Sequence, residues 1–139
     1  MLLESERLGQ LEVDEESIIT VPEGLLGFED RTRFALIPAD ELGAYTWFHA
    51  IDDPSLAFLA VVPGFFFDDY APDLPAGDVT ALDLTDPADA QVLCLVTIAG
   101  DAITANLMGP IVVNVRSRLG RQVVLPDQGY GAREPLGGG

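Results

Sequence analysis

The side chains that usually perform nucleophilic or acid–base chemistry are scarce in this chain. It has one histidine, His49, and one cysteine, Cys94, and catalysis by either needs a partner group held beside it. His49 follows Phe48 in a strand-like run, and Cys94 stands between two leucines. Because reactive thiols need electropositive, partly exposed surroundings, we expect both residues to belong to the core. The protein is therefore predicted to be a binding protein and not an enzyme.

Adjacent acids are the next groups that could do chemistry, and they occur at Glu15-Glu16, Asp52-Asp53 and Asp68-Asp69. Two neighbouring carboxylates can bind Ca²⁺, but the twelve-residue pattern of an EF-hand is missing from the sequence. The pair before Pro54 is typical of a turn. No glycine-rich phosphate loop, HExxH or CxxC motif occurs either, so we predict no cofactor and no metal.

Three arginines lie close together near the C-terminal end of the chain, at positions 116, 118 and 121. They are the residues that could hold the phosphate of a flavin or similar cofactor, so a small barrel enzyme or ligand-binding module is the alternative function. We favour the interpretation that Arg116, Arg118 and Arg121 lie on an exposed hairpin turn and pair with neighbouring acids.

The charge of the chain limits its partners. Of its 139 residues, 23 are acidic and 7 basic, which gives a formal net charge of −16, and no lysine is present. A surface this negative repels a phosphate backbone, so direct nucleic-acid binding is not expected. The longest apolar run, residues 56–67, is interrupted by Pro63 and Gly64 and is too short to span a membrane. We expect a cytoplasmic protein without membrane contact, because the acidic start of the chain is unlike a signal peptide.

The elements that must position these residues are predicted to be strands. Glycine and proline occupy 14 and 10 positions and interrupt nearly every window long enough for a helix. Ten short runs rich in β-branched and aromatic residues predict strands over residues 8–13, 17–21, 32–37, 45–51, 56–62, 79–84, 91–98, 103–107, 111–116 and 121–125. Many short strands favour an all-β fold, a small antiparallel β-barrel with short helical turns.

Two segments are predicted to form helical turns. Asp86 can cap a turn that begins at Pro87, and residues 64–70 have room for one or two turns between two prolines. The clearest hairpin is expected around Gly120. We expect a single domain over residues 1–133, followed by a flexible tail over residues 134–139.

Phe65-Phe66-Phe67-Asp68-Asp69-Tyr70 is the segment that a core alone explains least well. Three consecutive aromatic residues on a short turn cannot all face one interior, so at least one should reach the surface beside the acid pair. Exposed aromatic residues surrounded by charge serve as anchors in protein interfaces. Packing of the remaining ring beneath a loop is the alternative.

Four stretches of the sequence together resemble the FliW family of bacterial flagellar assembly factors. They are Pro22-Glu-Gly-Leu-Leu-Gly-Phe-Glu29, the Leu56-Ala-Phe58 strand with Pro63 and Asp69-Tyr70 after it, Thr104-Ala-Asn-Leu-Met-Gly-Pro-Ile-Val-Val-Asn114, and Gly120-Arg-Gln-Val-Val-Leu125 with Tyr130 and Arg133 after it. They follow the family's order across nearly the whole chain, and the Thr-Ala-Asn-Leu-x-x-Pro-Ile pattern is the most specific.

The resemblance implies an antiparallel β-barrel without enzymatic activity that binds two alternative protein partners. One is flagellin before its export, and the other is CsrA, a small RNA-binding translational repressor. Once flagellin has left the cell, a protein of this family binds and allosterically inhibits CsrA, which relieves repression of flagellin mRNA. The acidic charge of this chain suits a basic RNA-binding partner. The free protein is expected to be a monomer.

The resemblance and the residue pattern together predict a partner interface of seven residues: Phe66, Asp68, Asp69, Tyr70, Asn106, Leu107 and Met108. Phe66, Tyr70, Leu107 and Met108 would supply an apolar patch for amphipathic helices. Two alternatives stay open: Asn106 can cap a turn through backbone bonds, and Leu107 can be a core residue of the barrel. Gly24 and Gly27 are expected to provide positive φ in a turn.

Overall fold

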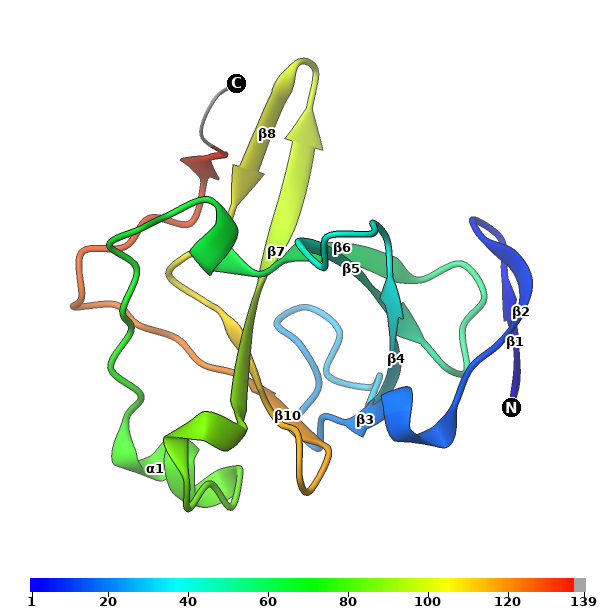
Figure 1. The fold of residues 1–139 in the computed structure, drawn as a ribbon, viewed down its shortest axis with the longest axis horizontal. Helices are drawn as coiled ribbons and strands as arrows, with labels where there is room; N and C mark the ends of the chain where they lie inside the picture. The colour runs from blue at the N-terminus through cyan, green and yellow to red at the C-terminus, as the bar shows by residue number, and fades with distance from the viewer. Residues whose placement is uncertain (137–139) are drawn as a thin grey trace.

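Seven short strands form a closed barrel in the computed structural model, which describes residues 1–136 (Figure 1). Around the barrel the order is β7, β6, β5, β4, β3, β10 and β9, and β9 pairs again with β7 to close the wall. The strands are β3 Ile18–Thr20, β4 Arg33–Pro38, β5 Tyr45–Ala50, β6 Ala57–Val61, β7 Ala90–Ala99, β9 Ile111–Asn114 and β10 Leu119–Gln122. Neighbours are antiparallel except β10 and β3, which are parallel. The predicted all-β barrel is confirmed.

Strand β7 closes the barrel and then leaves it. Its first residues pair with β9 from Ala90 to Leu93, Cys94 and Leu95 pair with β6, and Val96 to Ala99 pair with β8, Ala102–Ala105. The β7–β8 hairpin therefore projects away from the barrel (Figure 1). One strand of ten residues thus belongs to the barrel wall at one end and to an outer sheet at the other.

The barrel interior is filled by side chains that alternate along the strands. Phe34 and Phe48, both fully buried, stack with ring centroids 4.5 Å apart, and Ile19, Val21, Ile111 and Val113 complete this cluster. The β3–β4 loop enters one end of it with Leu25 and Phe28. Gly24 has φ +68°, and a side chain there would overlap the backbone at Glu29, so the loop requires this glycine. Gly27 also has positive φ, as expected.

Two small strand pairings lie outside the barrel. The N-terminal pair β1, Leu2–Ser5, and β2, Gly9–Glu12, forms a separate two-stranded sheet and packs Leu3 against Ala35 of β4. At the other end, β11, Glu134–Pro135, pairs with β8, and Leu136 is only 9% exposed. The prediction of a flexible tail from residue 134 is therefore wrong for residues 134–136. Pairing with β8 and burial of Leu136 hold these residues in place. The remaining residues of the predicted tail, 137–139, lie outside the described part of the chain.

A long crossover of residues 62–89 connects β6 to β7 and carries three helical segments, while a further 3-10 turn, Glu15–Ser17, precedes β3. The crossover contains 3-10 turns at Pro63–Phe65 and Pro87–Asp89 and the helix α1, Ala76–Ala81. Both predicted helical turns are confirmed, and the Asp86 carboxylate accepts a hydrogen bond from the Ala88 amide at 2.9 Å. The strand predicted over residues 79–84 is wrong. Pro75 starts a helix there, and the β-branched Val79 and Thr80 lie on it or at its end.

The hairpin of β9 and β10 forms, but its turn is not at Gly120. Gly120 lies within β10 and pairs with Val113, while the chain reverses over residues 115–118. A Cβ atom on Gly120 would lie 3.0 Å from the Ile19 side chain, so glycine here permits close packing of β10 on the interior. Within residues 1–136 no helix is long and apolar enough to cross a membrane.

Candidate partner-binding surface

The two residues best suited to nucleophilic chemistry are both buried. His49 is fully buried in β5, and its Nδ1 lies 2.7 Å from the Ala50 carbonyl oxygen. Cys94 is fully buried in β7, and burial raises the pKa of its thiol to about 12, an effect only partly offset by the polar hydroxyl of Tyr70. Cys94 is thus a protonated core thiol, as predicted. Among residues 1–136, no three or more His, Cys, Asp or Glu side chains are grouped in a way that could hold a metal ion.

The three C-terminal arginines make contacts within the fold. The Arg116 Nε lies 3.1 Å from an Asp89 carboxylate oxygen, and Arg121 pairs with Glu23 at 2.7 Å and with Asp78. Arg118 donates to the main-chain oxygen of Glu15 at 2.8 Å. The predicted exposed turn holds for Arg116 and Arg118, whereas Arg121 lies within β10 and is half-buried. Pairing with acids is confirmed for Arg116 and Arg121, and Arg118 binds a main-chain carbonyl instead.

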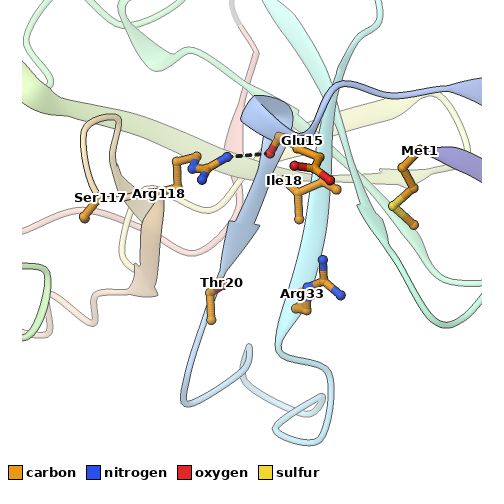
Figure 2. Close-up of a pocket in the computed structure, with 7 residues that line it drawn as sticks. All are labelled: Met1, Glu15, Ile18, Thr20, Arg33, Ser117 and Arg118. Carbon is orange, nitrogen blue, oxygen red and sulfur yellow. Dashed lines mark hydrogen bonds between the residues drawn. The ribbon is translucent and has the colours of Figure 1, made fainter.

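Arg118 lines a cavity of about 310 Å³, whose walls also include Arg33 and Glu15 but neither Arg116 nor Arg121. Figure 2 shows Arg118 and Arg33 reaching it from separate elements, with Ile18 and Glu15 between them. The Arg118 guanidinium is turned toward Glu15, whose own carboxylate also lines the space. This mixture of one engaged guanidinium, one exposed guanidinium and a carboxylate lacks the convergent donors of a phosphate site.

The aromatic–acidic segment presents one ring to solvent and folds the others inward. Phe65 is 56% exposed, and Asp68 and Asp69 are exposed as well. Phe66 is half-buried and meets Tyr45 edge to face with ring centroids 5.6 Å apart. At least one surface aromatic ring was expected; it is Phe65, which the predicted interface did not include.

Tyr70 connects the segment of residues 65–69 to the rest of the fold through two contacts. Its hydroxyl donates a 2.8 Å hydrogen bond to the Leu107 carbonyl, and its ring packs edge to face on Tyr130 at 4.6 Å. Burial raises the pKa of the Tyr70 phenol well above its usual value. The Tyr130 hydroxyl in turn accepts a bond from the Ala71 amide at 3.0 Å. Tyr70 is therefore an anchor of the segment that carries Phe65 and the acid pair.

The Asn106-Leu107-Met108 turn has a structural role in the described fold. The Asn106 side-chain oxygen accepts from the Met108 and Gly109 amides at 3.1 and 3.0 Å, which is the turn-capping alternative. Leu107 is 4% exposed and lies in a core cluster with Val61. Met108 is half-buried. The structure thus brings Tyr70 and Leu107 together, but the Leu107 side chain points into the core.

A second hydrogen-bonded junction joins three of the motif stretches. The Gln122 side-chain oxygen accepts from the Leu26 amide at 2.9 Å, and its nitrogen donates to the Gly109 carbonyl at 3.1 Å. Above this junction lies a cavity of about 350 Å³ whose walls include Phe28, Phe58 and Asn106, and Leu26 at its edge is 66% exposed. Gln122, Leu26 and Tyr130 were missing from the predicted interface, although each lies in a stretch that carries the family resemblance.

Comparison with known proteins finds one family over nearly the whole described chain. Residues 2–136 match the family model described as FliW protein. Relatives named "Flagellar assembly factor FliW" include those of Moorella thermoacetica, 42% identical over 98% of this chain and 88% of its own length, and of Bacillus subtilis, 33% identical over 99% and 98%. The relative from Bdellovibrio bacteriovorus is 39% identical, covering 98% of this chain and 79% of its own.

The fold comparison agrees with the sequence comparison. A solved structure titled "Crystal structure of the flagellar assembly factor FliW" superposes with a TM-score of 0.90 at 29% identity, covering 98% of this chain and 96% of the other.

Proposed function

Because this chain belongs to the FliW family, we propose that it is a flagellar assembly factor that exchanges between two protein partners. One partner is flagellin, held before export. The other is a CsrA-type translational regulator, which the protein binds and inhibits allosterically when it is free of flagellin. Translation of flagellin mRNA then resumes. The exchange takes place in the cytoplasm, and the free protein is a monomer.

The observation that carries this proposal is the match of residues 2–136 to the family. The exposed Phe65 beside Asp68 and Asp69 supports binding to a protein, because a solvent-facing ring next to charges is typical of an interface anchor. Leu26 and Leu42, which are 66% and 80% exposed, add apolar surface elsewhere. None of these side chains is needed to fill the core.

The charge supports a basic partner over a nucleic acid. With a net charge of −16, the protein accelerates its encounter with a positively charged protein and repels RNA. Such a protein can remove a regulator from its RNA without touching the RNA. Complementary charge mainly increases the association rate, so affinity must come from buried apolar contacts.

A release assay tests the proposal. The CsrA-type regulator of the same organism is bound to a fluorescent flagellin leader RNA, and this protein is added at increasing concentration. We expect the RNA to be released while this protein alone leaves its anisotropy unchanged, and subsequent addition of flagellin should restore the RNA complex. RNA that stays bound to the regulator at saturating protein, or RNA that binds this protein directly, would contradict the proposal.

A further inference from the structure

An apolar groove lies where the crossover meets the barrel wall. Its volume is about 480 Å³, and its walls include Leu74, Val79, Leu84 and Val92, all of them half-buried. Helix α1 and the chain that follows it form one side, and the first residues of β7 form the other. The described structure thus leaves an apolar hollow open to solvent on the crossover.

The floor of this groove is firmly held. Leu74, Leu84 and Val92 pack on a buried cluster that contains Leu82. The Asn114 side chain of β9 donates to the main-chain oxygens of Leu82 and Asp83 at 2.9 and 3.1 Å, and the Asn114 residue is only 2% exposed. The hollow is therefore fixed to the barrel by buried contacts and is preformed for a ligand.

The rim of the groove is acidic. Asp86 lines it, and Asp73 and Asp83 are exposed next to its lining residues in the chain. Two nearby acids, Asp78 and Asp89, form ion pairs with arginines, whereas within residues 1–136 no salt bridge involves the other three. From residue 34 to residue 115 the sequence has 12 acids and no Lys or Arg, so no basic side chain of this long stretch can neutralise the rim.

We propose that this groove is the docking site for the basic, RNA-binding partner. An apolar side chain of that partner enters between Leu74, Leu84 and Val92, and its Lys or Arg side chains face Asp73, Asp83 and Asp86. A protein that binds a phosphate backbone must carry such basic side chains. A second copy of this acidic chain, or an acidic peptide, would be repelled at the same rim.

The inference rests on the proposed function, because it assigns a position to one of the two proposed partners. Its first test is a titration of the ¹⁵N-labelled full chain with the unlabelled CsrA-type regulator. We expect the largest shift changes or line broadening at the amides of Val79, Leu84 and Val92. Changes confined to other parts of the barrel would overturn this docking site while leaving the proposed function intact. Failure of the regulator to bind at all would overturn both.

A matched pair of double variants gives the second test. Asp73→Asn with Asp83→Asn removes two rim charges, and Asn tolerates the positive φ of Asp83, which is 56°. Glu41→Gln with Asp101→Asn removes the same net charge from exposed positions elsewhere. By calorimetric titration at low salt we expect the rim variant to bind the regulator about tenfold more weakly and the control to stay within about twofold of the unmodified protein.

The salt dependence of the affinity distinguishes the effect of the rim charges from that of the net charge of the protein. The affinity of the unmodified protein should fall as salt rises, and that of the rim variant should fall less steeply. Equal losses in the two double variants would mean that only the net charge matters, and no loss in the rim variant would mean that the partner binds elsewhere. Either result overturns the proposal. Thermal melting of both variants close to that of the unmodified protein confirms that their folds are intact.

Discussion

The segment of residues 65–69 and the turn of residues 106–108 were both expected to contact a partner. They differ in whether their side chains make contacts within the fold or are exposed to solvent. In the turn, Asn106 is bound to two backbone amides and Leu107 lies in the core. In the segment, Phe65 is 56% exposed and the two acids beside it face solvent. Tyr70 joins the two regions through its bond to the Leu107 carbonyl.

The more specific of the two sequence patterns is therefore the one with a structural role. The Thr-Ala-Asn-Leu stretch needs particular residues because a capped turn and a buried side chain admit few alternatives. The aromatic–acidic segment, which we propose contacts a partner, presents exposed apolar area and charge, and many sequences can supply these.

The largest effect is expected from a charge at Leu107. Leu107→Asp should lower the free energy of unfolding by about 3–5 kcal/mol, because it removes a buried apolar side chain and buries a carboxylate. Urea unfolding followed by circular dichroism measures the change. Leu26→Asp is the matched control, since Leu26 is 66% exposed and the change should cost less than about 0.5 kcal/mol. Equal effects of the two variants would mean that Leu107 is not a core residue in solution.

Alkaline pH should weaken the buried cluster around Tyr70 before it affects the exposed segment. The folded pKa of Cys94 is raised to about 12 and that of Tyr70 is raised as well, so the unfolded state loses these protons first. Their contribution to stability is complete below about pH 9 and is lost as the pH rises toward 12, by at most about 1.4 kcal/mol per pH unit for each group.

Urea midpoints measured from pH 8 to pH 11 test this linkage. The midpoint should fall across the range, and Cys94→Ala should reduce the slope because one of the two groups is gone. Native Cys94 should also resist a thiol reagent at pH 8 and react once the chain is unfolded. Rapid reaction of the native protein would show that this cluster opens easily.

Removal of the Asn106 cap should have an intermediate effect. Asn106→Ala leaves the Met108 and Gly109 amides without their side-chain acceptor and should cost about 1 kcal/mol. Asn106→Asp keeps an acceptor oxygen and should recover most of that loss. Thermal melting measures both. If the two variants were equally destabilised, the hydrogen bonds would not be the cause.

The smallest stability effect, with a clear binding effect, is expected in the aromatic–acidic segment. Asp69→Arg should change the free energy of unfolding by less than about 0.5 kcal/mol, because Asp69 is exposed, while weakening the complex with the basic regulator. Glu41→Arg gives the same change of net charge at another exposed position. A melting temperature many degrees lower, or binding no weaker than in the Glu41 variant, would remove Asp69 from the interface.

Much of the barrel could be predicted because its strands are short apolar runs between glycine and proline turns. The core positions of His49 and Cys94 could also be predicted, since each lies inside such a run. Helix α1 could not, because six residues are too few for a helical period and two of its residues are β-branched. Strand β11 depends on a pairing with the distant β8, which local propensity does not contain.

The surface was harder to predict than the fold. Phe65 and Phe66 are adjacent and identical in type, and only the packing of Phe66 on Tyr45 decides which ring is exposed. From its sequence context Leu107 could belong to the core or to an interface. Its burial in a core cluster with Val61 assigns it to the core. The groove beside α1 is formed by residues from 72 to 92 whose contact requires the crossover to fold back on β7.

Partner exchange requires that flagellin and the CsrA-type regulator compete for this protein. Calorimetric titration measures the affinity of this protein for the CsrA-type regulator with and without saturating flagellin, and its affinity for flagellin with and without the regulator. Partner exchange predicts that each partner lowers the affinity for the other by the same factor, as linkage requires. If both affinities are unchanged by the other partner, the protein does not exchange between them and the proposed function is wrong.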